Sequence, residues 1–434
     1  MNKARVAFKT FGCKLNFSES SALSRELAEN GYNPVAIDEK ADIYVIHTCA
    51  VTSQAESKCR KAIRQAKRKN PDSIVAVMGC YSQLQPEYLA GLEETDMIIG
   101  NAEKFALQEC LKLFRTAKTK GMHVSDVQTH TDYFPAFSSG DRTRSFLKVQ
   151  DGCDYFCSYC TIPMARGRSR SQPVSETMKL AEKAAATNAR EIVLTGVNIG
   201  DYGKNTKENL SDLMSAMENL DNADRIRISS IEPDLLTDEI IDHIASSGKF
   251  MPHLHLPLQS GSDAILKLMN RNYDTELYRD RVRRIKDTMP HACIAADVIT
   301  GFPGETDLNF KETCNFIDSL DVSYVHVFTY SERPGTKAAR MKNKVPPREK
   351  KSRSHYLHIL SAKKKQYFYG KNRGRKVPVL FESDIQKGHM YGWSDNYIRV
   401  KRPYNPDFVN KIIPVTINRM DNNGIFFCNE TSRE

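Results

Sequence analysis

The chain has 434 residues, a formal net charge of +10 and 11 cysteines, and a chain of this length is expected to fold as two or three domains without disulfide crosslinks. The cysteine number is odd, no apolar run is long enough to span a bilayer, and the first residues lack the apolar centre of a secretory signal. We therefore expect a cytoplasmic protein with reduced thiols and no membrane partner, in which grouped cysteines hold metal or carry out chemistry.

Strand-like and helical patterns alternate over roughly the first 125 residues. The runs RVAFKTFGC, DIYVIHTCAVT and SIVAVMGCYSQ are separated by the amphipathic stretches SSALSRELAEN and AESKCRKAIRQAKR. This alternation predicts a parallel sheet, and we assign residues 1–125 to an N-terminal α/β domain. Cys13, Cys49 and Cys80 each follow one of the three strands, 36 and 31 residues apart. Loops after parallel strands emerge at one edge of a sheet, so we expect the three thiols to converge.

A second domain is expected over residues 139–370, after a polar linker. It contains six strand candidates, SFLKVQ, EIVLTG, RIRISS, HLHLPLQ, CIAADVIT and YVHVFTY, with helical patterns between them. Six successive strand–helix units predict an incomplete (β/α)6 barrel, whose chemistry belongs in the loops after the strands. Polar or glycine-rich residues cluster at these strand ends, which makes them candidate binding residues: Thr195, Gly196, Asn198, Ser229, Glu232, Gln259, Ser260 and Gly301. For a single Ser or Asn, the alternative is a helix cap.

Residues 371–434 lose the helical period and consist of short strand-like runs such as KVPVLFES and IIPVTINRM, which predict a small all-β barrel of the oligonucleotide-binding type. Two basic runs, residues 58–69 and 363–376, each contain seven Lys or Arg and no acid, and the second includes three aromatic residues. They favour nucleic acid as a partner. The alternatives are a solvated helix face for each run and a protein-binding or oligomerisation module for the last domain.

The motif C-x3-C-x2-C in DGCDYFCSYC, formed by Cys153, Cys157 and Cys160, directly follows the first barrel strand. Structural zinc requires four ligands, and the next cysteine is Cys293, so zinc would need a distant residue such as His253 or His255. A 4Fe-4S cluster held by three thiolates instead keeps its fourth iron open for a substrate or cofactor. The position at a barrel strand end favours the cluster, and zinc stays as the alternative.

With this motif on a six-unit barrel, the chain resembles the radical S-adenosylmethionine methylthiotransferase family in FGCKLN, HTCAVT, VMGCYSQ, HLPLQSGSD, ITGFPGET and YSERPGTKAA. The resemblance spans nearly the whole chain and implies an N-terminal methylthiotransferase domain, a radical domain and a C-terminal TRAM domain. The stretches RISSIEP and TGVNIGDYG are most similar to members that convert threonylcarbamoyladenosine in tRNA, beside the anticodon, to its 2-methylthio form. Other members, which modify isopentenyladenosine in tRNA or an aspartate of a ribosomal protein, remain alternatives.

The resemblance implies two 4Fe-4S clusters. One, on Cys153, Cys157 and Cys160, would bind and cleave S-adenosylmethionine, and the other, on Cys13, Cys49 and Cys80, would carry the sulfur to be inserted. Residues expected near S-adenosylmethionine are Thr195, Gly196, Asn198, Ser229, Gln259, Ser260, Arg166 and Gly301, and those expected near the substrate are Glu232, Arg168, Lys371, Arg373 and Arg375. The implied partners are the tRNA anticodon stem-loop, an electron donor such as flavodoxin or ferredoxin, and a sulfur source. A non-catalytic, zinc-containing RNA-binding protein is the alternative from another class.

Overall fold

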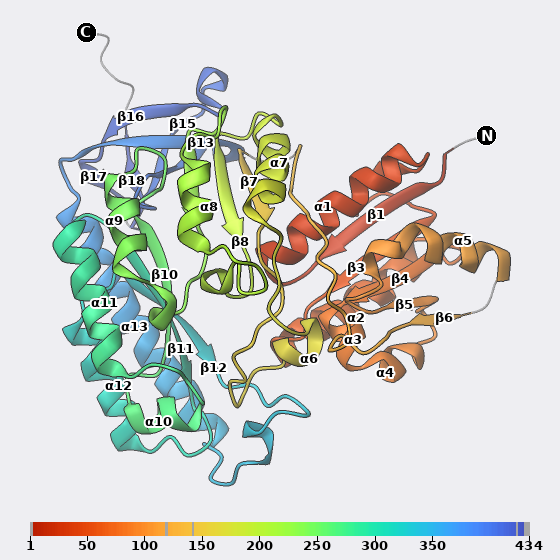
Figure 1. Ribbon diagram of the computed structural model, residues 1–434, viewed down its shortest axis with the longest axis horizontal. Helices are drawn as coiled ribbons and strands as arrows, with labels where there is room; N and C mark the ends of the chain where they lie inside the picture. Colours follow the sequence, from red (N-terminus) through yellow and green to blue (C-terminus); the bar gives the residue numbers. More distant parts are fainter. Residues whose placement is uncertain (1–2, 118–119, 141–142, 422–423, 429–434) are drawn as a thin grey trace.

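The computed structural model describes residues 3–117, 120–140, 143–421 and 424–428 (Figure 1). The outermost residues of the predicted first and last domains, 1–2 and 429–434, lie outside this description. Among the described residues, no helix combines the length and the apolar character needed to cross a membrane.

The N-terminal region is a six-stranded parallel sheet in the order β2-β1-β3-β4-β5-β6. Its strands are β1 (Arg5–Thr10), β2 (Asn33–Val35), β3 (Ile43–Thr48), β4 (Ile74–Gly79), β5 (Met97–Ile99) and β6 (Gly121–His123). Its helices are α1 (Lys14–Glu29), α2 (Ser53–Lys69), α3 (Cys80–Leu84), α4 (Pro86–Ala90) and α5 (Leu107–Ala117). The side chains of β3 are all buried, as expected for a parallel strand covered on both faces. The three predicted strands are β1, β3 and β4, and they are neighbours in the sheet.

The central region confirms the six predicted strand–helix units. Its strands are β7 (Arg144–Lys148), β8 (Glu191–Thr195), β9 (Arg225–Ile228), β10 (His253–Gln259), β11 (Cys293–Thr300) and β12 (Tyr324–Thr329). Its helices are α6 (Ile162–Arg166), α7 (Val174–Ala185), α8 (Leu210–Met217), α9 (Asp238–Ser246), α10 (Asp263–Leu268), α11 (Thr275–Thr288), α12 (Asp307–Ser319) and α13 (Pro347–Lys371). The strands form two parallel sheets, β7-β8-β9 and β10-β11-β12. Met251 N donates to Ile226 O at 2.9 Å and joins the two halves.

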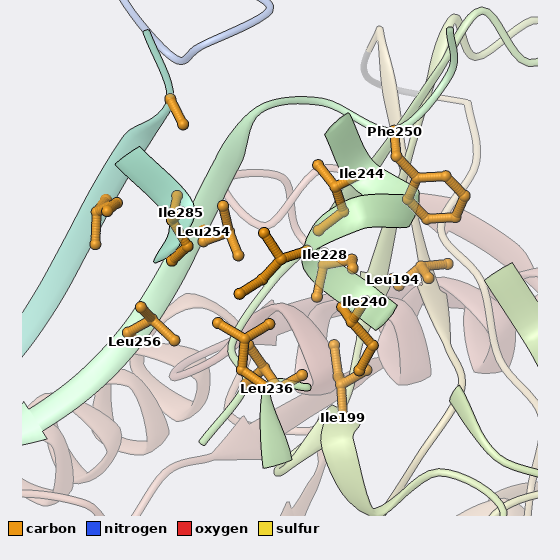
Figure 2. Packing of buried hydrophobic residues seen from close by; sticks show 14 of the residues in the cluster. Leu194, Ile199, Ile228, Leu236, Ile240, Ile244, Phe250, Leu254, Leu256 and Ile285 are labelled. Carbon is orange, nitrogen blue, oxygen red and sulfur yellow. The ribbon is translucent and has the colours of Figure 1, made fainter. Parts of the chain in front are cut away.

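One face of the barrel strands builds the hydrophobic core (Figure 2). Leu194 of β8, Ile228 of β9 and Leu254 of β10 pack in one cluster with Ile240 of α9 and Ile285 of α11. Successive side chains of a strand point to opposite faces, so the residues between these positions face the interior of the partial barrel. By this alternation His255 of β10, Asp297 of β11 and His326 of β12 lie on that interior face.

The C-terminal region is all-β, as predicted. Its strands are β13 (Lys376–Gln386), β14 (His389–Ser394), β15 (Arg399–Pro403), β16 (Ile412–Thr416), β17 (Arg419–Met420) and β18 (Phe426–Phe427), in the order β16-β13-β14-β15-β18-β17. Its core also contains Phe368 and Tyr369 from the end of α13, so this core begins before residue 371. Two of the three aromatic residues in the basic run 363–376 are therefore part of this core. Only Tyr367 is exposed, because the other two rings are needed to close the small core.

The C-terminal sheet packs against the end of the barrel where the strands begin. Arg144, the first residue of β7, pairs with Glu382 at 2.6 Å, and Arg225, the first residue of β9, donates to Pro378 O at 2.7 Å. His253, the first residue of β10, stacks on Tyr397 with 4.2 Å between ring centroids. The opposite end of the barrel, where the strands end, is thereby left to the N-terminal region (Figure 1).

Candidate functional site

Cys153, Cys157 and Cys160 lie in the loop between β7 and α6. Burial raises the pKa of all three thiols, to about 12 for Cys160, and the charge of Cys157 adds to this effect at both of the others. The three sulfurs are therefore close neighbours. Each also accepts a hydrogen bond from nitrogen: Cys153 Sγ from Tyr155 N and Cys160 Sγ from Ile162 N, both at 3.4 Å, and Cys157 Sγ from an arginine at 3.1 Å.

The second triad is assembled at the edge of the N-terminal sheet, as the sequence predicts for loops that follow β1, β3 and β4. Cys49 immediately follows β3, Cys80 immediately follows β4, and Cys13 precedes α1. Gly12 has φ +97°, and a Cβ there would lie 2.9 Å from Cys49 Cβ, so only glycine permits this approach of the first two loops. Burial raises the pKa of Cys13 and Cys49, to about 12 for the latter, and the nearby Cys80 raises both further.

Side chains from both regions connect the two triads. Asn16 Oδ1 accepts from Cys13 Sγ at 3.7 Å and from Arg166 Nη2 at 2.6 Å. Asn101 Nδ2 donates to Cys80 Sγ at 3.6 Å and to Ala165 O at 2.6 Å. Since Ala165 and Arg166 belong to α6, which begins two residues after Cys160, this short helix lies between the triads.

The loop that carries Cys49 of the second triad also contacts the barrel. Arg333, beyond the end of β12, donates to Ala50 O at 3.3 Å and pairs with Glu56 at 2.6 Å. Ala50 directly follows Cys49. Each cysteine of the second triad is thus linked to the barrel, Cys13 through Asn16, Cys80 through Asn101 and Cys49 through the adjoining Ala50.

A cavity of about 200 Å³ extends from Cys160 of the first triad to Thr52, three residues after Cys49 of the second. Its lining also includes Gln259 at the end of β10, Asp297 within β11 and Tyr330 just after β12. Gln259 has φ +64°, a conformation that costs energy for a residue with a side chain, at a position where the pairing of β10 with β11 is irregular. Such strain at a strand end is characteristic of binding sites.

The sequence matches two family descriptions, "Uncharacterized protein family UPF0004" over residues 5–100 and "Radical SAM superfamily" over residues 147–317. A threonylcarbamoyladenosine tRNA methylthiotransferase of Bacillus subtilis is 38% identical over 95% of this chain and 94% of its own. A second enzyme of this name, from Aquifex aeolicus, is 38% identical over 92% of this chain and 96% of its own. A tRNA-2-methylthio-N(6)-dimethylallyladenosine synthase of Staphylococcus aureus is 31% identical over 96% of this chain and 83% of its own. The chain belongs to the methylthiotransferase family.

The fold agrees with this family. A radical S-adenosylmethionine methyltransferase from Kitasatospora setae, TsrM, solved with cobalamin and a [4Fe-4S] cluster bound, covers 78% of this chain and 77% of its own. Its TM-score is 0.55 at 14% sequence identity, a likeness that concerns the fold alone.

For a methylthiotransferase, three cysteines at each triad fit an iron–sulfur cluster with one open iron better than a four-ligand zinc site. The three sulfurs of the first triad also accept N–H donors, which matches the hydrogen bonding typical of iron–sulfur sites. His253 stands at the far end of β10 against Tyr397, and His255 Nε2 is hydrogen-bonded to Asp297 at 2.8 Å, so neither histidine serves as a fourth ligand in this arrangement. Because burial raises the pKa of the Cys13, Cys49, Cys153, Cys157 and Cys160 thiols, binding of iron at these sulfurs would release protons.

The polar residues predicted at the end of β8 surround one glutamine. Gln150 Oε1 accepts from Val197 N at 2.8 Å and Asn198 N at 2.9 Å, and a Cβ on Gly196 would lie 2.9 Å from it. Thr195 Oγ1 donates back to Val193 O at 3.1 Å. Asn198 Oδ1 is buried and has no hydrogen-bond partner among the described residues, so this oxygen remains available to a ligand.

Several other predicted cofactor residues have structural partners. Arg166 is fully buried with its guanidinium directed to Asn16, Glu19 and Asp151, so it is not directed into the cavity. Ser260 Oγ lies 3.2 Å from Thr313 Oγ1. Gly301 N donates to Glu305 at 2.7 Å in a turn with φ +73°. Ser229 is half-buried, and its N–H donates to Leu194 O at 3.2 Å.

The residues predicted to contact the substrate are spread over the molecule. Glu232 is paired with Arg271, and burial raises its pKa to about 7. Arg168 is exposed, with its guanidinium 5.0 Å from the ring centroid of Phe156. Three further predicted residues lie after α13 or at its end, far along the chain from the triads: Lys371, Arg373 and Arg375. Lys371 pairs with Asp321 at 3.2 Å, and Arg375 donates to Asn372 at 2.6 Å.

The sequence did not reveal Arg271, Asn101 or Arg333, which contact or adjoin the cysteines. Arg271 Nη1 is the donor to Cys157 Sγ, although 114 residues separate the two in the chain. Nothing in the local pattern MNRNYD distinguishes this arginine from an ordinary surface residue. A signal is found only in the structure, where its side chain is 2% exposed.

Proposed function

We propose that the protein is a tRNA methylthiotransferase that converts threonylcarbamoyladenosine, next to the anticodon, to its 2-methylthio form at C2. The observation that carries this proposal is the cavity that joins Cys160 of one cysteine triad to the segment after Cys49 of the other. The relatives from B. subtilis and A. aeolicus, 38% identical over nearly the full chain, bear this activity in their names and support the substrate assignment.

Two 4Fe-4S clusters and S-adenosylmethionine are the proposed cofactors. Cys153, Cys157 and Cys160 would hold one cluster and leave one iron open to S-adenosylmethionine, while Cys13, Cys49 and Cys80 would hold the other. These groups supply the one-electron chemistry and the sulfur, which no side chain can provide at an unactivated aromatic C–H bond. The contribution of the protein is to position the base and exclude water. Asn198 and Gln259 are the proposed polar contacts to S-adenosylmethionine.

The proposed macromolecular partner is the anticodon stem-loop of tRNA. Basic residues on α2 are exposed and available to phosphates: Lys58, Lys61, Arg64, Arg68 and Lys69. Arg168, with Phe156 beside it, adds an exposed cation and ring next to the first triad. Phosphate contacts of this kind predict RNA binding that weakens steeply as salt increases. A small electron-donor protein of the flavodoxin or ferredoxin type and a sulfur source complete the proposed cytoplasmic reaction.

Anaerobic reconstitution and nucleoside mass spectrometry test the proposal. The full chain should bind about eight iron atoms, and alanine substitution of either triad should leave about four. The variant that lacks Cys153, Cys157 and Cys160 should lose cleavage of S-adenosylmethionine. The variant that lacks Cys13, Cys49 and Cys80 should retain cleavage but form no methylthiolated nucleoside. Product from RNA with isopentenyladenosine but none from RNA with threonylcarbamoyladenosine would contradict the proposed substrate.

A further inference from the structure

The interior of the partial barrel contains a group of titratable side chains that the cysteine chemistry does not use. His255 of β10, Asp297 of β11 and His326 of β12 present ligand atoms within 4.8 Å of one another. His255 Nε2 lies 2.8 Å from Asp297 Oδ1, and the ring of His326 packs edge-on against His255 with 5.7 Å between centroids. His326 is exposed although it lies in the middle of a strand, so the space in front of it is open.

A fourth member of this group is Lys14, which directly follows Cys13. Burial lowers the pKa of His326 and His253, and the charge of Lys14 lowers both further, so its ammonium acts on the same interior space. Lys14 is accessible to solvent, and within the described part of the chain its ammonium has no hydrogen-bond or ion-pair partner. Desolvation and the charges of Arg144 and Arg227 lower the pKa of Lys14 to about 8 against the opposing charge of Glu191, so Lys14 is still a cation at neutral pH beside Cys13.

The charges around this space favour an anion over a metal ion. Two histidines and one aspartate are a familiar ligand set for divalent metals. Here, however, Asp297 already accepts a hydrogen bond from His255, and Glu191, which acts on Lys14, accepts two hydrogen bonds from the Arg227 guanidinium at 3.0 and 3.1 Å. The ammonium of Lys14 would repel a divalent cation in this space.

The space in front of these residues is also where the substituent of the substrate base must lie. Adenine C2 and the carbon that carries N6 are separated by a single ring nitrogen. A base that presents C2 between the two triads therefore brings its N6 substituent into the same space. Lys14 adjoins Cys13, and Asp297 shares the cavity with Cys160, so the charged group borders both triads.

We propose that Lys14 and His326 bind the carboxylate of the threonylcarbamoyl group, while Asp297, oriented by His255, accepts a hydrogen bond from its hydroxyl or N–H. This inference rests on the proposed function and names the side chains that select the substrate. An isopentenyl group offers neither a carboxylate nor a donor and would leave Lys14 unpaired. Sites built for polar groups discriminate strongly against analogues that lack them, because the buried partners then remain unsatisfied.

The test measures binding by the reconstituted full chain to three fluorescent anticodon stem-loops that differ only at the target adenosine. One carries threonylcarbamoyladenosine, one its methyl ester and one unmodified adenosine. The wild-type chain should bind the acid about 10-fold or more tightly than the ester, as expected for hydrogen bonds to a charged group. Lys14→Met and His326→Asn should each remove most of this preference without changing the affinity for unmodified RNA.

The control variant is Lys311→Met, which removes an exposed lysine of α12 and should preserve the preference for the acid. Iron content and the visible spectrum of each variant establish that Lys14→Met leaves the neighbouring cluster in place. Equal binding of acid and ester by the wild-type chain, with methylthiolated product still formed, would overturn this inference and leave the proposed function intact. Absence of product from threonylcarbamoyladenosine RNA with fully loaded wild-type enzyme would overturn the proposed function itself.

Discussion

Arg271 connects a sulfur of the first triad directly to the barrel. It donates to Cys157 Sγ at 3.1 Å, pairs with Glu232, and lies 4.8 Å from the ring centroid of Tyr273. A cation and an N–H donor at a cluster sulfur stabilise the added electron and raise the reduction potential. Arg271 therefore acts as a positioning residue for electron transfer to S-adenosylmethionine in the proposed reaction.

Replacing Arg271 by methionine should make the first cluster harder to reduce. Loss of an outer contact to a metal ligand typically lowers activity about 10- to 100-fold, and we expect a decrease of this size in the rate of 5′-deoxyadenosine formation. The matched control is Arg283→Met on α11, where an exposed arginine pairs only with Asp280 at 2.6 Å. A redox titration followed by electron paramagnetic resonance checks the shift, and an unchanged potential would contradict this role.

At this scale the cysteines could be predicted and their polar partners could not. Residue type, spacing and position after a strand are enough to identify thiolate ligands, because few other side chains bind iron in this way. Hydrogen-bond donors such as Asn101 and Arg271 come from distant segments and use common residue types, so no local pattern marks them. Arg166 was assigned to the cofactor from its place beside the motif, but its partners Glu19 and Asn16 lie about 150 residues away.

At the scale of elements, the sequence predicted the long strands and missed the short ones. β1, β3, β4 and the six barrel strands have enough residues to show an apolar run between turns. β2, β5 and β6 have three residues each, which is too few to produce a pattern. Such strands form because neighbouring strands supply hydrogen-bond partners, which is information that the local sequence does not contain.

The end of β10 combines strain with function. Gln259 lines the cavity with φ +64°, and the pairing with β11 shifts register between Pro257 and Gln259. Gln259→Gly should relieve a conformational cost of roughly 1 kcal/mol, while Gln259→Val should lose about 1–2 kcal/mol. Both variants lack the amide and should cleave S-adenosylmethionine more slowly. Chemical denaturation and 5′-deoxyadenosine assays measure the two effects, and a destabilised glycine variant would contradict the assignment of strain.

On the scale of the whole molecule, a buried charge network fixes the N-terminal sheet to the barrel. Glu19 of α1 pairs with Arg166 of α6 at 3.1 Å, with Lys148 of β7 at 2.8 Å and with Lys104 at 2.7 Å. Burial raises the pKa of Glu19, but these three cations outweigh it and hold the pKa well below its usual value of 4.5. His47, 3.7 Å away, is kept neutral because burial lowers its pKa to about 3.

Glu19→Gln should therefore destabilise the chain by about 3–5 kcal/mol at pH 7, since it leaves buried cations without their shared counter-charge. The pKa of this carboxylate is lower in the folded state, so its contribution is present above pH 4.5 and is lost as the pH falls below that value. The difference between wild type and variant should then narrow toward acid pH in denaturant unfolding curves.

The same substitution should separate the two proposed chemical steps. Glu19 of α1, the helix after Cys13, pairs with Arg166 of α6, the helix after Cys160. Loss of this pair should therefore change the position of one triad relative to the other more than it changes the geometry within either triad. We expect cleavage of S-adenosylmethionine to continue while the yield of methylthiolated nucleoside per cleavage falls. Glu29→Gln, at an exposed position of the same helix, should change neither stability nor yield. An unaltered yield in a destabilised Glu19→Gln chain would show that the network supports the fold without setting the distance between the triads.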